Sequence, residues 1–382
     1  MFWPNEAATA QLLTDLAGAL AARDWEVHVI AAGTEANVLG RVTIHRTGAE
    51  PAGRLGRYLH FLRAARRLLR RLIAPGDIVI LKTDPPLLAV AATDLARARG
   101  AHVVQWIQDI YPEVASAHVG EWSAPLLAPL RAARNRAWRA SAHCVPVSED
   151  MAATVRAAQV SAAPTTALPN WAPQELDTPA AGGEVAAVRR DWQAEGKFLV
   201  AYSGNLGRVH EFATILDAAA LLRDDTRIRF AFIGGGPRLT EVRAGVAQRG
   251  LKNVVFHPPQ PRARLAAALA APDAHLVTLR SGFERFVAPS KLAGVLAAGR
   301  PALFVGPTDS AIAHLLQNES CGVAVRNGDA PALAASIAAW STNATHVAAL
   351  AAGARRAYER HFRCADLVPR WDALLRTIAA RR

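Results

Sequence analysis

The sequence predicts an α/β protein of two Rossmann-like, doubly wound domains that face a cleft. Short runs of β-forming residues alternate with stretches rich in Ala and Leu, and several runs are apolar throughout, as buried parallel strands are. The alternation is interrupted at residues 163–183, which are rich in Pro, Ala and Gly and indicate a linker. A chain of 382 residues with 51% hydrophobic content can form two cores.

Each domain receives its own series of expected strands. The first domain, residues 1–172, is expected to hold strands at residues 26–31, 42–46, 77–82, 102–107 and 142–147. The second domain, residues 173–365, is expected to hold strands at residues 198–203, 228–233, 253–257, 274–279, 301–305 and 322–325. Repeated strand–helix units imply right-handed crossovers, and ligands in such sheets bind beyond the carboxyl ends of the strands.

Residues 281–301 carry the most informative segment of the chain. Glu284 precedes a Pro-Ser-Lys triplet in which Ser290 and Lys291 stand where a helix begins. Free backbone N–H groups, a hydroxyl and an ammonium at that position all favour an anion, and Glu284 can accept hydrogen bonds from sugar hydroxyls. The segment therefore predicts a phosphate anchor beside an acid. The alternative is a capped surface helix with a solvated lysine.

Two further strand ends in the second domain carry residues suited to a nucleotide. Gly204, Asn205, Gly207 and Arg208 follow the expected strand 198–203. Glycines allow close backbone approach, and an arginine fork matches a diphosphate. Gly234 and Gly235 follow the next strand, where a tight loop could approach a nucleotide, although glycine loops are weak signals by themselves. The alternative for Arg208 is an exposed residue in a strand–helix turn.

In the first domain, Asp109 follows the expected strand 102–107 and is predicted to lie on the cleft side, where an acceptor would bind. A helix or turn cap is the alternative for this residue. Asp84, after the strand 77–82, is expected to shape a turn. Both predictions rest on the position of polar residues at carboxyl ends of parallel strands.

The net charge of +12 is concentrated in residues 54–72, which carry seven arginines and no acid. Leucines and Tyr58 recur there at helical spacing, so the segment predicts a basic amphipathic helix, a pattern typical of binding to anionic lipid. The alternative is an ordinary domain helix whose apolar side meets a sheet. Nucleic acid is disfavoured as a partner, because the sequence has no helix-turn-helix, zinc or RNA-binding signature.

Cysteine usage and hydropathy predict a cytoplasmic protein that could lie on the inner face of the membrane. Cys144, Cys321 and Cys364 have no metal-like spacing and no even pairing, which fits a reducing compartment. No run of 18 apolar residues is present, and no signal peptide is expected. No Asp-x-Asp motif or His cluster is present, so no metal is expected.

Five stretches together resemble a known family. The chain resembles retaining glycosyltransferases of the GT-B fold in family 4, and within it the bacterial branch of fucosamine and colanic-acid transferases. The likeness spans nearly the whole chain and lies in residues 2–10 (FWPNEAATA), 108–113 (QDIYPE), 168–171 (LPNW), 202–208 (YSGNLGR) and the Pro-Ser-Lys segment.

This resemblance implies a function and roles for the residues. A nucleotide sugar, expected to be a UDP-sugar, would bind the second domain, and a glycan or a polyprenyl-diphosphate-linked acceptor the first, in surface-polysaccharide synthesis. The final helix, about residues 366–382, would pack back on the first domain. Lys291 and Arg208 would neutralise the leaving diphosphate, Glu284 would hold sugar hydroxyls, and Asp109 would lie near the sugar or the acceptor hydroxyl.

The chain departs from the family pattern in three places. The second glutamate of the usual pair reads as Gly294, and the usual Arg and Lys of the phosphate loop correspond to Asn205 and His210. The short apolar strand expected before residues 2–4 is not in the sequence, so we expect the true start to lie upstream. Two alternatives remain: an isomerase like the non-hydrolysing UDP-GlcNAc 2-epimerases, and a non-catalytic GT-B binding subunit.

Overall fold

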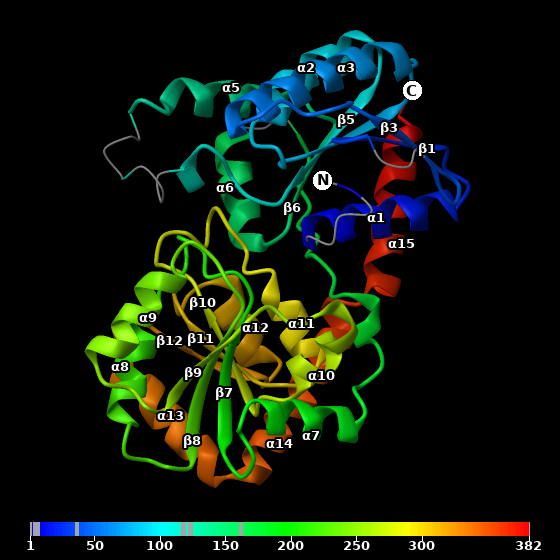
Figure 1. Ribbon diagram of the computed structural model, residues 1–382. Helices are drawn as coiled ribbons and strands as arrows, with labels where there is room; N and C mark the ends of the chain where they lie inside the picture. Colours follow the sequence, from blue (N-terminus) through cyan, green and yellow to red (C-terminus); the bar gives the residue numbers. More distant parts are fainter. Residues whose placement is uncertain are drawn as a thin grey trace. The chain divides into compact units, whose positions relative to one another are not determined.

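The computed structural model describes residues 2, 8–34, 38–115, 120, 125–159 and 163–381, and the chain divides into two compact units (Figure 1). Unit 1 comprises Met1–Asn170, Arg285–Ala288 and Cys364–Arg382. Unit 2 comprises Trp171–Glu284 and Pro289–Arg363. Residues 3–7 of the first resemblance stretch lie outside the described residues.

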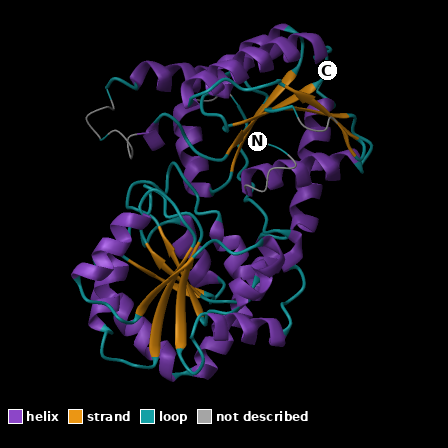
Figure 2. Ribbon diagram, in the orientation of Figure 1, coloured by secondary structure: helices purple, strands orange, loops and turns teal. Residues whose placement is uncertain are grey.

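Unit 2 contains one six-stranded parallel sheet, in the order β12-β11-β10-β7-β8-β9 (Figure 2). Its strands are β7 (Phe198–Ser203), β8 (Ile228–Ile233), β9 (Val254–His257), β10 (Ala274–Thr278), β11 (Ala302–Val305) and β12 (Gly322–Val325). Its helices are α7 (Gly182–Asp191), α8 (Ala213–Leu221), α9 (Leu239–Gln248), α10 (Leu265–Ala270), α11 (Lys291–Ala297), α12 (Ala311–Asn318), α13 (Ala330–Thr342) and α14 (Ala344–His361). The segment 163–183, predicted as a linker, also contains a short 3-10 turn (Gln174–Leu176) and the first residues of α7.

Strand β7 shows why this sheet is doubly wound. Val200 and Tyr202 are buried in one apolar cluster with residues of α8 and α13, while Leu199 and Ala201 are buried in another with residues of α7 and α10. Successive side chains of a strand point to opposite faces, so an apolar run covered by helices on both faces loses water from both. Burial of this kind contributes about 25 cal/mol per Å² of apolar surface removed from water.

The strand order places a topological switch point beside β7. From β7 the chain proceeds through β8 and β9 on one side, and β10, β11 and β12 follow on the other side. The loops that follow β7 and β10 therefore leave the carboxyl end of the sheet in opposite directions. A crevice outside the carboxyl ends of the strands at such a point is the usual ligand site in open α/β sheets.

Unit 1 differs from the single sheet that the sequence predicted. Its strands form two three-stranded sheets, in the orders β1-β3-β2 and β4-β5-β6. Strand β2 is a short antiparallel addition that was not predicted. Among the described residues β1 pairs only with β3 and β4 only with β5. The strands are β1 (Val27–Ala31), β2 (Val38–Leu39), β3 (Val42–Arg46), β4 (Ile78–Lys82), β5 (His102–Ile107) and β6 (His143–Pro146).

Helices cover both sheets of unit 1, among them α1 (Ala8–Ala21), α2 (Arg54–Leu72), α3 (Leu88–Ala98), α5 (Ala128–Arg139), α6 (Glu149–Gln159) and α15 (Cys364–Ala379). The last helix belongs to this unit although it ends the chain. The indole of Trp371 is fully buried and meets the ring of Trp106 on β5 edge-on, with 5.1 Å between centroids. The Trp25 Nε1 donates to Asp372 Oδ1 at 2.7 Å.

One short segment corrects the predicted domain boundary. Residues 285–288 belong to unit 1, although the sequence pattern placed them in the second domain. The chain first passes from unit 1 to unit 2 between residues 170 and 171, whereas the predicted boundary lies between residues 172 and 173. The reason is backbone pairing: Asp109 and Val287 form an isolated antiparallel bridge, and the Ile110 amide donates to the Phe286 carbonyl at 2.8 Å. Such bonds satisfy polar groups that burial would leave unpaired.

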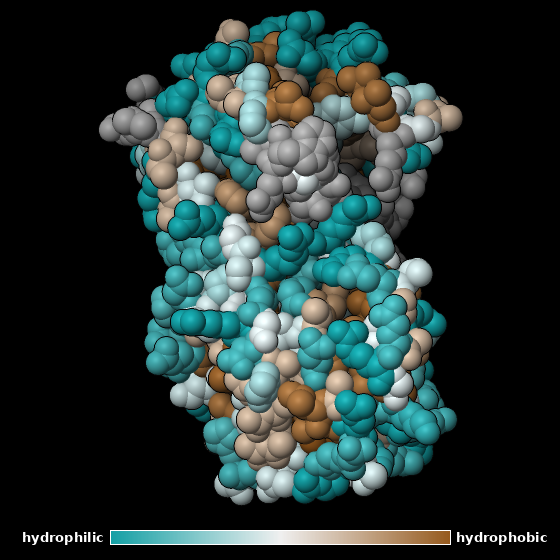
Figure 3. Space-filling view, turned by 90° about the vertical axis from the view of Figure 1, so that its left-hand side faces the viewer, coloured by the Kyte–Doolittle hydropathy of each residue, from teal (hydrophilic) through white to brown (hydrophobic). Residues whose placement is uncertain are grey.

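The surface, the hydropathy of the helices and the cysteines show no feature of a membrane-spanning segment or a disulfide among the described residues. The face drawn in Figure 3 is mostly hydrophilic, with apolar side chains gathered in separate patches. None of the described helices combines the length and the hydropathy that crossing a bilayer requires. All three cysteines are buried free thiols.

Candidate functional site

The side chain of Lys291, the first residue of α11, lies in a cluster of polar groups in unit 2. Its Nζ lies 2.5 Å from the Tyr202 hydroxyl oxygen and 3.5 Å from both the Asn205 carbonyl oxygen and His210 Nε2. It also lies 4.1 Å from the centroid of the Tyr202 ring. Because α11 follows β10 and Tyr202 lies near the end of β7, this cluster stands at the switch point of the sheet.

The imidazole of His210 presents a lone pair to this lysine. Its Nδ1 lies 2.5 Å from the Thr278 carbonyl oxygen, which can only accept, so Nδ1 carries the proton and Nε2 is an acceptor. Burial, followed by the charge of Lys291, lowers the pKa of His210 to about 3. The ring is therefore neutral at neutral pH.

The ammonium of Lys291 has no carboxylate partner within the described part of the chain. Burial lowers the pKa of Lys291 to about 7, since the charged form loses water. The three protein groups that face its Nζ are uncharged acceptors. A partly buried cation that is hydrogen-bonded but not neutralised favours the binding of an anion, because an anion adds the charge that the protein omits.

The glycines of the two loops have a structural role that the sequence did not predict. A Cβ at Gly234 would collide with the backbone of Gly204, and one at Gly236 would lie 2.5 Å from Asn205 Oδ1. Leu206 donates its amide to the Gly235 carbonyl at 2.7 Å. The close approach at Gly234 and Gly236 is therefore between the loops after β7 and β8. A Cβ at Gly235, by contrast, would meet no atom within 4 Å.

Gly204 and Gly207 are more closely tied to the lysine cluster. Gly204 has a φ of 126°, and a Cβ there would lie 3.2 Å from Lys291 Cε. A Cβ at Gly207 would lie 3.3 Å from Asn205 Nδ2 and 3.4 Å from His210 Cδ2. A side chain at either position would press on groups that hold or surround the ammonium.

The other predicted residues of unit 2 lie nearby in sequence but have different contacts. Ser290 is exposed and its side chain caps no backbone amide of α11, which has seven residues. Glu284 accepts from the Gly282 amide at 2.8 Å and so supports its own loop. Arg208 is exposed and makes no hydrogen bond or ion pair within the described residues. The structure gathers Gly204, Asn205, Gly207 and Lys291 into one cluster but not Arg208.

Sequence reasoning left Tyr202 and His210 out of the site. Tyr202 was read as part of a strand, and His210 only as the replacement for a family cation. The sequence does contain a signal: Tyr202 is a polar residue near the end of an apolar strand, and His210 follows the Gly204–Gly207 loop by three residues. Their meeting with Lys291 depends on which strand lies next to β7.

Unit 1 carries a second polar cluster, at the carboxyl ends of β4 and β5. Lys82 is only 7% exposed, and its Nζ donates to the Thr9 carbonyl. Thr9 Oγ1 lies 3.5 Å from Asp84 Oδ2. Thr83 Oγ1 accepts from the amides of Gln108 and Asp109, at 2.9 and 3.2 Å. The hydroxyl of Thr83 therefore ties the two strand ends together.

Asp109 titrates unusually in this cluster. Burial, and then the charge of Asp84, raises the pKa of Asp109 to about 6, and Lys82 partly opposes the rise. Burial lowers the pKa of Lys82 to about 8, against the pull of Asp84 and Asp109. A carboxyl group with this pKa is mostly ionised at neutral pH, but its ionised form is less stable in the folded protein than it would be in water. Such groups are frequent at functional sites.

We expect Asp109→Asn to stabilise unit 1 above about pH 6 and to leave its stability unchanged below about pH 4. The folded state holds the Asp109 proton more tightly than the unfolded chain does, so wild-type stability falls as the pH rises between these values. Melting temperatures measured from about pH 4 to about pH 8 check this expectation. Asp94→Asn, at an exposed position, is the control. A parallel pH dependence for wild type and Asp109→Asn would contradict it.

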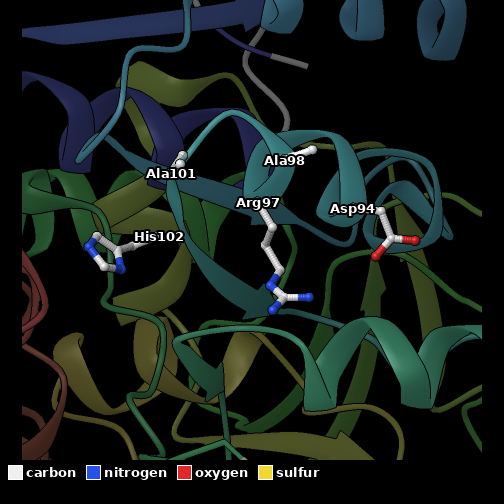
Figure 4. A pocket seen from close by; sticks show the side chains of 6 residues that line it. Asp94, Arg97, Ala98, Ala101 and His102 are labelled. Carbon is white, nitrogen blue, oxygen red and sulfur yellow. The ribbon is translucent and has the colours of Figure 1, made fainter.

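A shallow depression of about 540 Å³ lies elsewhere in unit 1, between the end of α3 and the start of β5 (Figure 4). Asp94, Arg97 and His102 line it, and it stands at the amino end of β5. The polar cluster of Lys82 and Asp109 stands at the opposite edge of this sheet. The depression is therefore separate from the candidate site.

Family profiles match both units. The profile described as Glycosyltransferase Family 4 matches residues 9–175, and the one described as Glycosyl transferases group 1 matches residues 186–357. The chain is 33% identical over 150 residues to WcaI of Escherichia coli (strain K12), named as a colanic acid biosynthesis glycosyl transferase. It is 26% identical over 261 residues to WbjE of Pseudomonas aeruginosa, named as a glycosyltransferase.

These two alignments cover only part of each protein. They span 39% and 68% of this chain, and 37% and 64% of the length of WcaI and WbjE. The chain therefore matches less than two thirds of either relative's own length.

Solved structures share the fold over nearly the whole chain. Anabaena HepE in complex with UDP and glucose has a TM-score of 0.72 at 16% identity, covering 99% of this chain and 97% of that one. WaaG, a glycosyltransferase involved in lipopolysaccharide biosynthesis, has a TM-score of 0.71 at 16% identity, covering 99% and 98%. Sucrose-phosphate synthase from Thermosynechococcus elongatus has a TM-score of 0.78 at 17% identity, covering 98% and 94%. These likenesses establish the GT-B fold.

Proposed function

The chain belongs to glycosyltransferase family 4, and on that premise we propose that it transfers a sugar from a nucleotide-sugar donor in bacterial surface-polysaccharide biosynthesis. The observation that carries the proposal is the Lys291 ammonium, which is held at the switch point of unit 2 by neutral acceptors and has no carboxylate partner in the described part of the chain. A donor diphosphate would supply that missing negative charge.

In this proposal the charge of the leaving diphosphate is the main target of catalysis. As the sugar–phosphate bond breaks, negative charge grows on the leaving group, and a fixed cation stabilises it without reorganising. Lys291 would do this directly, and Arg208, exposed on the loop after β7, would add a second cation. Gly204, Asn205, Gly207, Gly234, Gly235 and Ser290 would border the nucleotide, and Glu284 would hold sugar hydroxyls.

The polar cluster of unit 1 would serve the acceptor. Asp109 would face the transferred sugar or the acceptor hydroxyl, a role supported by its position at the end of β5 and by its raised pKa. We further propose retention at the anomeric carbon, a UDP-sugar donor, and a glycan or polyprenyl-diphosphate-linked acceptor. UDP and glucose occur with HepE, a structural relative, which supports UDP as the first nucleotide to test.

A panel of UDP-, GDP- and dTDP-sugars tests the proposal by thermal shift and by nucleotide release. A ligand that binds only the folded state at about 100 times its Kd stabilises it by about 2.7 kcal/mol. We expect the sugars of one nucleotide class to raise the melting temperature. We also expect the free nucleotide to be released from that donor when an acceptor is added. Stabilisation without release under any acceptor would favour a binding subunit. Interconversion of the sugar without acceptor would favour an isomerase.

The proposal also includes catalysis without a metal ion, because protein cations would neutralise the diphosphate. Turnover in excess EDTA should then equal turnover in added Mg²⁺ or Mn²⁺. Recovery of lost activity by one of these ions would show that the protein cations do not suffice.

Contact with the membrane through α2 is the remaining part of the proposal. Leu55 and Leu59 are 69% and 38% exposed, whereas Ala64, Ala65 and Leu69 are buried, so part of the apolar side packs in unit 1 and part is free. Exposed arginines continue along the helix at positions 63, 67, 70 and 71. Leucines and arginines together favour an anionic bilayer.

We expect replacement of Arg63, Arg67, Arg70 and Arg71 by Gln to remove sedimentation with anionic liposomes at low salt. Each basic residue near an anionic surface contributes about 1 kcal/mol, and salt screens this attraction. Arg66 is kept because its guanidinium donates to the Ala91 carbonyl. The control removes the same charge from unit 2, with Gln at the exposed Arg190, Lys252, Arg326 and Arg356. Equal binding by both variants would remove α2 from this role.

A further inference from the structure

We infer that Tyr202 and His210 are positioning residues that hold the Lys291 ammonium in a neutral acceptor cage, so that its charge is left for the donor diphosphate. The inference rests on the proposed function for the identity of the anion. The cage itself rests on distances: the Tyr202 hydroxyl, the Asn205 carbonyl and His210 Nε2 all lie within 3.5 Å of Lys291 Nζ.

Tyr202 is oriented to accept from the lysine. Its single hydroxyl hydrogen is donated to the Asn205 carbonyl at 2.8 Å, so the oxygen lone pairs remain for the ammonium. Its ring, which extends from β7, is fully buried among apolar residues, and edge contacts with Phe212 at 5.1 Å and His210 at 6.0 Å fix its plane. The ammonium lies above this ring as well, which adds a cation–π interaction.

His210 is locked from both sides. Its Nδ1–H is held by the Thr278 carbonyl on β10, and its own carbonyl accepts from the Arg238 guanidinium. The charged groups near the cage are engaged elsewhere: Arg238 is paired with Glu241, and the carboxylate of Glu211 accepts from the Thr214 amide. A carboxylate in the cage would neutralise the lysine and repel a diphosphate. Neutral acceptors do neither.

The cage explains how a lysine can serve as a cation in this place. Burial lowers the pKa of Lys291 to about 7, while hydrogen bonds accepted from the ammonium favour the charged form. Removing one acceptor should therefore lower the pKa further, and binding a diphosphate should raise it. Above about pH 7 the site would take up a proton when the donor binds, so donor affinity would fall with rising pH.

The first test measures Lys291 without any ligand. The chain has four lysines, at positions 82, 197, 252 and 291, so NMR of lysine-labelled protein resolves each titration, and Lys291→Ala assigns the signal. We expect Tyr202→Phe and His210→Asn each to lower the Lys291 pKa by about one pH unit, a tenfold loss of proton affinity. Asn at position 210 can still donate to the Thr278 carbonyl, but its shorter side chain has no atom at the position of His210 Nε2, which faces Lys291.

Matched controls separate the cage from a general loss of packing. Tyr358→Phe removes another buried hydroxyl of unit 2, and His275→Asn removes another buried imidazole. Both should leave the Lys291 titration within about 0.2 pH units of wild type. An unchanged Lys291 pKa in the folded Tyr202→Phe and His210→Asn proteins would overturn the cage.

The second test uses UDP as the probe, with GDP and dTDP in parallel. We expect calorimetry to give a five- to tenfold weaker Kd for Tyr202→Phe and His210→Asn than for wild type at about pH 7.5. The loss should be larger at about pH 8.5, because more of the lysine must then take up a proton, while the phosphates are ionised at both pH values. Wild-type binding with no loss in either variant would also overturn the cage. Failure of wild type to bind any of the three would overturn the proposed donor, while the NMR titration would still decide the cage.

Discussion

Lys291→Ala is expected to reduce kcat/KM for the nucleotide-sugar donor by about 30- to 900-fold. The variant loses a charge-assisted contact to the leaving diphosphate that strengthens as the bond breaks, a loss of about 2–4 kcal/mol of transition-state stabilisation. Steady-state kinetics with varied donor concentration measures the effect, and the fall should be larger in kcat than in 1/KM.

Lys252→Ala is the matched control, because Lys252 is an exposed lysine of the same unit. It should retain wild-type kinetics. Kinetics of Lys291→Ala within about threefold of wild type, in a protein that melts normally, would end the assignment of Lys291 to the diphosphate. Lys291→Arg should recover little activity, because a planar guanidinium does not match the three acceptors that surround the compact ammonium.

Trp371→Ala is expected to destabilise unit 1 by about 3–5 kcal/mol. Trp371 is fully buried on α15 and packs against Trp106 of β5, so truncation leaves a cavity beside the strand that carries Asp109 at its end. Urea unfolding followed by tryptophan fluorescence, with hydrogen exchange of the β5 amides, measures the loss in unit 1 itself.

Trp371→Phe should cost much less than Trp371→Ala. The indole Nε1 of Trp371 is buried and has no hydrogen-bond partner among the described residues, so the phenyl ring removes an unsatisfied donor while it keeps most of the contact with Trp106. A loss below about 1 kcal/mol in Trp371→Ala would show that α15 does not hold the core of this unit together.

Much of the architecture could be read from local pattern. The bounds predicted for β7, β8 and β12 are those observed, and α11 begins at Lys291, within the Ser290–Lys291 pair where a helix start was expected. The membership in glycosyltransferase family 4 and the GT-B fold are likewise confirmed. These features depend on runs of apolar residues and on turn residues, which act over a few neighbouring positions.

The roles of individual residues could be read less well. Gly234 was predicted only as part of a tight loop that could approach a nucleotide, and the sequence did not predict that its Cβ position is filled by the backbone of Gly204. Residues 285–288 were assigned to the second domain, but they pair with the strand end at Asp109 in unit 1. In both cases the deciding contact joins loops that are remote in sequence, and no local pattern records it.

The sequence by itself determined which segments become strands and helices, where a cation and an acid stand relative to strand ends, and to which family the chain belongs. Only the tertiary structure decided that Lys291 meets Tyr202 and His210, which are 89 and 81 residues away along the chain. That meeting requires β10 to lie beside β7, and sheet order follows from the packing of all helices and strands together. Burial and hydrogen bonding in that packed state then set the charge of the lysine, which composition and spacing leave open.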